Sequence, residues 1–212
     1  MKLFQLQGRD GASKLLGMVQ AVPDIWTGAV LDVGCRTGEF QRLLAGSIKE
    51  TVSYVGVDLQ PPASALANLE RGLPFPDKTF EVVVALDVLE HTDNIHMAFE
   101  ELCRVSQKFV LVLLPNAYEL ATRIRFLRGR PLSGKYGLPL VAPQDRHRWL
   151  FGFMEAQAFV HHQAANSRFV LQEERCVVGP RRARVLGVNV CEAWPNLLCQ
   201  WYMALLKREK HA

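Results

Sequence analysis

Two short segments of nearly continuous apolar residues constrain the fold of this chain more than any other feature. They are Phe80–Asp87 (FEVVVALD) and Lys108–Pro115 (KFVLVLLP), and a helical pattern follows Asp93 between them. A strand with one face in water alternates apolar and polar residues, whereas a strand buried on both faces needs no such alternation. The helices that cover both faces are the connections between parallel strands. The two segments therefore predict an α/β fold, in which a parallel sheet has helices on both faces.

Alternating strand-like and helix-like patterns extend this arrangement along the rest of the chain. Asp58–Pro74 leaves few residues for a complete helix and strand, so we expect a reduced unit there: either a short helix around Ala63–Glu70 that leads into an abbreviated strand, or no strand at all. The tail around Trp201–Leu206 fits either a last strand or an amphipathic helix. Further strands are predicted at Ala29–Val33, Val52–Asp58 and Phe169–Val178, and helices at Ser13–Val22, about Thr37–Ala45, about Ala117–Arg128 and Phe153–Ala164.

Length and composition limit the class of protein. With 212 residues, 49% of them apolar and 22% charged, the chain fits one globular domain that spans residues 1–212. No apolar run approaches the roughly 20 residues that cross a bilayer, and the N-terminus lacks the apolar region of a signal peptide. The five cysteines have no CxxC spacing and are expected to be reduced thiols that form no zinc site. These features predict a cytoplasmic protein without a transmembrane segment or a bound metal.

A basic segment lies between Ala121 and Leu150, where Asp145 is the only acidic residue. Part of this segment, about residues 129–150, is rich in Gly and Pro and is predicted to be an irregular insertion. Two interpretations remain open: a solvated helix face with a surface loop, or a rim that attracts an anionic substrate. The basic residues are Arg123, Arg125, Arg128, Arg130, Lys135, Arg146 and Arg148.

The segment Val30–Phe40 (VLDVGCRTGEF) reads as a strand, a tight loop with Gly34 and Gly38, and the start of a helix. A doubly wound sheet binds ligands at this place, beside the carboxyl end of its first strand. A dinucleotide loop normally has GxGxxG spacing, and Asp32 would repel a diphosphate. The same carboxylate suits S-adenosylmethionine (SAM), which has an ammonium group, a sulfonium centre and no phosphate. The loop therefore predicts a SAM site rather than a nicotinamide dinucleotide site.

Asp58 ends the next predicted strand and lies one strand–helix–strand step beyond Asp32. Its carboxylate can accept hydrogen bonds from both ribose hydroxyls of the cofactor, a contact that neutral side chains rarely match. The neighbouring Leu59 is placed to pack on the adenine. Asp58 and Leu59 are therefore candidate cofactor-binding residues.

Four segments form an ordered series of motifs: VLDVGCRTGEF (30–40), YVGVDL (54–59), LPFPDKTFEVVVALDVLEHTDN (73–94) and ELCRVSQKFVLVLLPN (101–116). The series resembles class I SAM-dependent methyltransferases, most closely the single-domain branch called methyltransferase type 11. The resemblance implies a Rossmann-like, doubly wound sheet of seven strands with the last strand antiparallel, and methyl transfer from SAM. It places Asp32, Gly34 and Gly38 in the loop around the methionyl group. It also places Asp58 at the ribose and Asp87 near the methyl group or the loop.

Two positions depart from the family pattern. Where the family commonly has glycine, this chain has Arg36. Its side chain either turns outward toward Glu39, from a backbone with φ < 0, or pairs with the methionyl carboxylate of the cofactor. A carboxylate often contacts the adenine just before LPFPD, and in this chain Asn68 or a backbone group takes that place.

The motifs leave the methyl acceptor and the catalytic residues unidentified. A hydroxyl acceptor needs a nearby base, and the candidate bases are His91 and His147, although His91 also suits a structural role at a helix start. The arginines suit a small or glycan-like anionic acceptor, with Phe126, Tyr136 and Trp149 as stacking or packing residues. Nucleic acid is less expected at a net charge of +4. A catalytically silent SAM-binding module is the alternative function.

Overall fold

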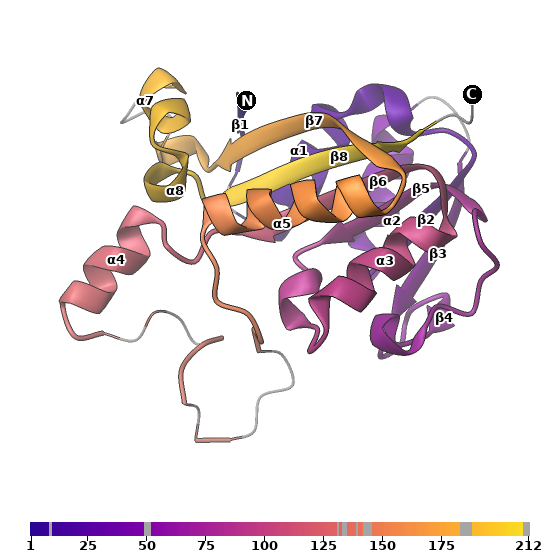
Figure 1. The fold of residues 1–212 in the computed structure, drawn as a ribbon, viewed down its shortest axis with the longest axis horizontal. Coiled ribbons are helices and arrows are strands. Elements are labelled where there is room, and N and C mark those ends of the chain that lie inside the picture. The colour runs from indigo at the N-terminus through magenta and orange to yellow at the C-terminus, as the bar shows by residue number, and fades with distance from the viewer. Residues whose placement is uncertain are drawn as a thin grey trace.

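Eight strands form one sheet with helices on both faces among the residues that the computed structural model describes: 1–8, 10–48, 52–130, 132, 135–138, 140–141, 146–182 and 188–209 (Figure 1). The strands are β1 (Lys2–Gln5), β2 (Ala29–Val33), β3 (Ser53–Asp58), β4 (Ala65–Leu66), β5 (Phe80–Leu86), β6 (Ser106–Pro115), β7 (Phe169–Val178) and β8 (Trp201–Arg208). The α-helices are α1 (Gly11–Ala21), α2 (Glu39–Ser47), α3 (Ile95–Val105), α4 (Leu120–Leu127), α5 (Phe153–Asn166), α7 (Val188–Ala193) and α8 (Pro195–Leu198). Their order in the sheet is β1-β7-β8-β6-β5-β2-β3-β4.

The central strand β5 is buried on both faces, as its continuous apolar pattern predicts. Val83 points into a core cluster that includes Phe99 of α3, whereas Val82 points into a second cluster with Met18 of α1 and Leu44 of α2. β5 pairs in parallel with β2 on one side and with β6 on the other. The prediction of an α/β fold with a parallel central sheet and helices on both faces is confirmed.

The last strand, β8, is antiparallel to both of its neighbours, β6 and β7. Tyr202, Ala204 and Leu206 on one face of β8 are fully buried in the core cluster that also contains Phe99. The tail of the chain is therefore a strand and not an amphipathic helix, and it is antiparallel as the family resemblance implies.

The prediction of seven strands is wrong by one, because β1 adds a strand at the edge of the sheet. β1 runs parallel to β7, with Leu3 opposite Cys176. Its four residues, KLFQ, give too few alternating positions for a strand pattern to stand out in the sequence. Pairing with β7, rather than local pattern, determines this strand.

The connection between β3 and β5 is reduced, as predicted. It contains the two-residue strand β4, which pairs with the end of β3. A 3₁₀ turn, η2 (Leu69–Arg71), follows this strand. The expectation of a short helix around Ala63–Glu70 that leads into a strand is wrong, because the strand comes first and the turn second.

The basic segment begins with α4, which projects away from the sheet in Figure 1 and has no buried residue. The insertion predicted at about residues 129–150 falls partly outside the described residues, and so does Asp145. None of the helices in the described part of the chain has the length and apolar character that crossing a membrane requires.

Two of the five cysteines are paired in the structure. Cys176 on β7 and Cys199, just before β8, form a disulfide with a Cα–Cα distance of 5.6 Å, which lies in the usual range for this bond. Cys35, Cys103 and Cys191 are buried free thiols. The prediction of five reduced thiols is therefore wrong for one pair, which the antiparallel contact of β7 with β8 brings together.

Candidate functional site

The loop after β2 is held tightly between two neighbouring strands. Gly34 has φ = +77° and Gly38 has φ = +69°, in the left-handed region that glycine adopts without strain. The N–H of Gly34 donates to the Val57 carbonyl oxygen at the end of β3 (2.8 Å). A Cβ atom on Gly34 would lie 2.5 Å from a methyl group of Val88, which follows β5. The backbone of this glycine loop (residues 34–38) therefore lies close to the ends of both β3 and β5.

Arg36 has φ = +49°, so the expectation of an ordinary negative φ is wrong. Its backbone N–H donates to Asp58 Oδ2 (2.9 Å), and this bond between loop and strand favours the unusual conformation. Among the described residues, no ion pair joins Arg36 to Glu39. Arg36 instead lies near enough to Lys14 to lower the pKa of that ammonium group. The glycine that the family has at this position fits the observed backbone better than arginine does.

Arg36→Gly is expected to stabilise the protein by about 0.5–1 kcal/mol, because relief of the left-handed strain exceeds the entropy that glycine adds to the unfolded chain. Denaturant unfolding measures this gain. Lys78→Gly is a matched control, since Lys78 is also a cation at positive φ (+54°) but lies in the turn before β5. If SAM affinity falls in Arg36→Gly but not in Lys78→Gly, the result supports pairing of Arg36 with the methionyl carboxylate. If the affinity of Arg36→Gly equals that of wild type, this pairing is excluded.

Asp58, at the end of β3, is oriented by three backbone N–H groups. Oδ2 accepts from Arg36, and Oδ1 accepts from Leu59 (2.7 Å) and Gln60 (3.4 Å). Oδ2 keeps a free lone pair, and the bond from Gln60 to Oδ1 is long, so both oxygens can still accept from ligand hydroxyls. The side chain of Leu59 next to it is 67% exposed. The structure thus brings Asp58 and Leu59 together with the glycine loop, as the sequence predicts.

Asp32 lies at the inner end of this site and is only 4% exposed. Its Oδ2 accepts a hydrogen bond of 2.5 Å from the Tyr54 hydroxyl. Burial raises the pKa of Asp32 to about 7; the Tyr54 bond opposes this rise, and the charge of Asp58 adds to it. Tyr54 was not predicted as a site residue, although the strand pairing would place it there: it lies opposite Val30, two residues before Asp32, and so shares the face of Asp32.

Asp87 follows β5 and has φ = +54°. Its Oδ2 forms an ion pair with Lys14 of α1, and its Oδ1 is buried without a hydrogen-bond partner among the described residues. Burial lowers the pKa of Lys14; the charge of Glu90 opposes this effect, and Lys135 and Arg36 add to it. Lys14 comes from a helix distant in sequence, and no motif pointed to it.

The two candidate bases, His91 and His147, lie in contact with their ring centroids 4.6 Å apart. His91 ends the 3₁₀ turn η3 (Leu89–His91), which follows β5, whereas His147 comes from the basic segment. Both Nε2 atoms lie near Glu90 Oε1, at 3.8 Å from His91 and 3.9 Å from His147. Glu90 is fully buried. The fold thus assembles an acid and two imidazoles that the sequence analysis treated separately.

The other candidates have local roles. Asn68 Oδ1 accepts from the N–H of Glu70 and caps η2. Tyr136 lies 2.8 Å from His147, and the Trp149 indole donates to the Thr92 carbonyl oxygen, so both aromatic residues border the histidine pair. Phe126, by contrast, is largely exposed on α4.

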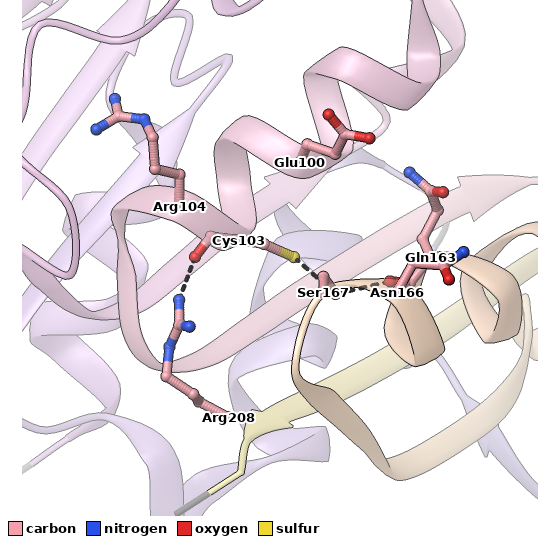
Figure 2. Close-up of a pocket in the computed structure, with 7 residues that line it drawn as sticks. All are labelled: Glu100, Cys103, Arg104, Gln163, Asn166, Ser167 and Arg208. Carbon is pink, nitrogen blue, oxygen red and sulfur yellow. Dashed lines mark hydrogen bonds between the residues drawn. The ribbon is translucent and has the colours of Figure 1, made fainter. Parts of the chain in front are cut away.

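A hollow of about 260 Å³ lies at the amino ends of the parallel strands, opposite the glycine loop (Figure 2). It is bordered by Arg208, at the end of antiparallel β8, which donates to the carbonyl oxygen of Ser106 at the start of β6. Cys103 Sγ also contacts Ser167 Oγ there (3.6 Å). Most of the hollow's polar groups bond to neighbouring protein groups, which indicates packing rather than ligand binding.

Comparison with known proteins identifies the family. A family model described as a methyltransferase domain matches residues 12–153. A search of curated proteins gives no match. The matched segment makes up more than half of the chain and runs from α1 to the first residue of α5, so it contains the glycine loop, Asp58 and the histidine pair.

Solved structures share the fold at low sequence identity. A SAM-dependent methyltransferase from Archaeoglobus fulgidus is 17% identical, with a TM-score of 0.56, and the match covers 94% of this chain and 96% of that chain. A complex of a methyltransferase activator and a putative methyltransferase from Haloferax volcanii matches at 11% identity and a TM-score of 0.59, over 95% of each chain. The small RNA methyltransferase HEN1 matches at 16% identity and a TM-score of 0.63, over 92% of this chain but 25% of that chain. The chain belongs to the methyltransferase-domain family and shares its fold with SAM-dependent methyltransferases.

Proposed function

We propose that this methyltransferase transfers the methyl group of SAM to a small or glycan-like anionic acceptor. One observation carries the proposal: Asp32, Asp58 and the glycine loop meet at the carboxyl ends of β2 and β3, with cationic side chains beside them. In doubly wound sheets this edge is where ligands bind.

The residues of this edge fit SAM in three ways. The buried carboxyl of Asp32 suits the ammonium group, because a positive ligand charge stabilises its ionised form. Asp58 is held by backbone N–H groups in a fixed orientation that suits the two ribose hydroxyls. Asp87 Oδ1 has spare accepting capacity on the same side of the sheet. We propose Asp32, Gly34, Gly38, Asp58, Leu59 and Asp87 as the cofactor-binding residues.

When bound, SAM supplies an electrophilic methyl group on a sulfonium centre. Displacement forms a bond from the acceptor atom to the methyl carbon and breaks the carbon–sulfur bond, whose electron pair stays on sulfur. The protein contributes alignment, which supplies much of the rate of such a reaction. His91 and His147 are the groups beside the site that can receive the acceptor's proton.

The anionic character of the acceptor is inferred from the charges around Lys14. Lys135 and Arg36 both lower the pKa of this ammonium group, so their positive charges lie within electrostatic range of it, while Asp87 pairs with it and the charge of Glu90 opposes their effect. Cationic side chains grouped beside a site attract anionic groups. This supports an acceptor that carries a carboxylate or phosphate.

Calorimetric titration tests the cofactor part of this proposal. We expect SAM and its demethylated product to bind the full chain, and NAD not to bind, because Asp32 repels a diphosphate. A methyl-release assay across pools of acidic glycans and phosphorylated metabolites then tests the acceptor. Absence of SAM binding at millimolar concentration contradicts the proposal, whereas SAM binding without methyl release to any pool favours a catalytically silent module.

A further inference from the structure

We propose that Glu90, His91 and His147 bind a divalent metal ion, and that this ion holds an oxygen atom of the methyl acceptor. The second part rests on the proposed function, whereas the metal site itself does not. The sequence predicts no metal site, because its cysteines lack ligand spacing. The proposed ligands are a carboxylate and two imidazoles instead.

The three ligand atoms lie at distances that suit one shared ion. Glu90 Oε1 is 3.8 Å from His91 Nε2 and 3.9 Å from His147 Nε2, and all three atoms lie within 4.8 Å of one another. Metal bonds of about 2.0–2.2 Å to nitrogen and oxygen place neighbouring ligand atoms roughly 3–4 Å apart. A small inward movement of the imidazoles is enough to complete the site. Glu90 is fully buried, so its carboxylate has little access to bulk water as an alternative partner.

Hydrogen bonds at the far side of each ring orient the histidines as metal ligands. His91 Nδ1 lies 3.0 Å from the Arg146 carbonyl oxygen, which only accepts, so Nδ1 carries the proton. The Tyr136 hydroxyl donates to the Trp149 carbonyl oxygen (3.3 Å) and therefore accepts from His147 Nδ1 (2.8 Å). In the neutral rings, both Nε2 atoms thus present lone pairs on the side of the Glu90 carboxylate. Metal-binding histidines typically have this arrangement of a donating Nδ1 and a coordinating Nε2.

Electrostatics favours a cation at this place, because two lone pairs and a buried carboxylate repel one another. The nearby Lys14 ammonium interacts with the Glu90 charge. Protons on the imidazoles or a metal ion can add positive charge at the three facing atoms themselves. One carboxylate with two imidazoles is a ligand set for Zn²⁺, Mn²⁺ or Fe²⁺, and it leaves coordination positions open. Mg²⁺ prefers oxygen ligands and is expected to bind more weakly.

Backbone hydrogen bonds hold the segment with His147 against the turn that contains Glu90 and His91. The N–H groups of Arg148 and Trp149 both donate to the Glu90 carbonyl oxygen, at 2.8 and 3.3 Å. These bonds attach the basic segment to the turn after β5, and they place His147 beside its partner ligands.

The cluster borders the cofactor side of the sheet. Glu90 lies close enough to raise the pKa of Lys14, which forms an ion pair with Asp87. The charge of Arg36 in the glycine loop lowers the same pKa. An ion on Glu90 therefore lies near the pair of Lys14 with Asp87. Its open positions suit an acceptor carboxylate, phosphate or hydroxyl oxygen. Coordination lowers the pKa of a bound hydroxyl, so with the ion in place the proton passes to solvent, and the imidazoles act as ligands and not as bases.

The test is calorimetric titration of the full chain with Zn²⁺ and Mn²⁺ after removal of bound metal with a chelator. We expect one ion per chain for wild type, and loss of about 100-fold or more in affinity for His91→Ala and for His147→Ala, since each removes a ligand. Tyr136→Phe leaves the ligands in place but removes the acceptor of the His147 proton, and we expect about tenfold weaker binding. His162→Ala is the matched control, because His162 lies on the exposed face of α5 and bonds to Asn166; its affinity should equal wild type.

Two results overturn the proposal: no saturable binding at millimolar metal, or equal affinity in wild type and both ligand variants. Either means that protons balance the charges of the cluster. Circular dichroism reports whether the variants fold. If the ligand variants do not fold, X-ray absorption of Zn²⁺-loaded wild type decides, since it shows imidazole ligation if the site is real and only oxygen ligands if it is not. SAM titration of the metal-free protein is the separate arm: metal binding without SAM binding overturns the proposed function and leaves the metal site standing.

Discussion

Asp32→Asn is expected to weaken SAM binding by about 30-fold, the loss of one hydrogen bond to a charged group. The same change is expected to stabilise the protein without cofactor. Asp32 is only 4% exposed, and burial raises its pKa to about 7. Asn keeps an oxygen that accepts from Tyr54 but has no charge to desolvate. Calorimetry and denaturant unfolding on the same two proteins measure the opposed effects.

Both the stability gain of Asp32→Asn and the SAM affinity of wild type should depend on pH, because the pKa of Asp32 is raised in the folded protein. A carboxyl whose pKa is higher folded than unfolded favours folding at low pH, below its unfolded value, and loses that contribution as pH rises to about 7. The stability advantage of Asp32→Asn over wild type should therefore grow by about 2 kcal/mol between about pH 5 and pH 8. SAM affinity of wild type should rise about tenfold per pH unit below pH 7 and then level off, because the ammonium group needs ionised Asp32.

The variant shows whether Asp32 causes this dependence. In Asp32→Asn, SAM affinity should be nearly independent of pH over the same range. A wild-type affinity that is already independent of pH means that Asp32 is ionised before the cofactor binds. That result contradicts both the raised pKa and its assigned consequence.

Local sequence patterns predict those strands that have helices on both faces. β5 and β6 carry unbroken apolar runs because both of their faces meet helices, so the sequence indicates them without knowledge of their partners. β1 and β4 have four and two residues, and only pairing with β7 and β3 makes them strands. The contact of Cys176 with Cys199 likewise depends on how β7 meets β8.

The residues of the site also divide into those that local sequence predicts and those that only tertiary contacts bring together. Asp32, Gly34 and Asp58 belong to a strand–loop–helix unit and to the strand beside it, so their spacing alone predicts that they meet. Lys14 reaches the site through tertiary packing and belongs to no motif, whereas Glu90 lies inside the motif segment 73–94 but had no predicted role. Arg36 was misjudged for a different reason: a residue type does not report φ, and the bond from its N–H to Asp58 favours a conformation that its side chain disfavours.

Asp58→Ala is expected to weaken SAM binding by about 200-fold, the largest effect of any single change in the site. The wild-type carboxylate can accept from both ribose hydroxyls, and bonds to a charged acceptor are stronger than neutral ones. Alanine also removes the acceptor of the Arg36 N–H, so the glycine loop loses its bond to the end of β3. For that reason the free energy of unfolding should fall by about 1 kcal/mol as well. Calorimetry with SAM and denaturant unfolding measure the two quantities.

Asp58→Asn separates these two roles of the carboxylate. Its amide oxygen can still accept from the Arg36 N–H, but its NH₂ then faces the N–H groups of Leu59 and Gln60. Stability should therefore fall by less than in Asp58→Ala, while the lost charge costs about tenfold in SAM affinity. Asp24→Ala removes an exposed carboxylate in the turn before β2, away from the glycine loop, and controls for the change in net charge. If Asp58→Ala binds SAM as tightly as the Asp24 variant, the ribose is held elsewhere, and the bond to Arg36 is then the only role of Asp58. If affinity and stability both fall in Asp58→Ala but stability falls clearly less in Asp58→Asn, one side chain both shapes the glycine loop and binds the cofactor.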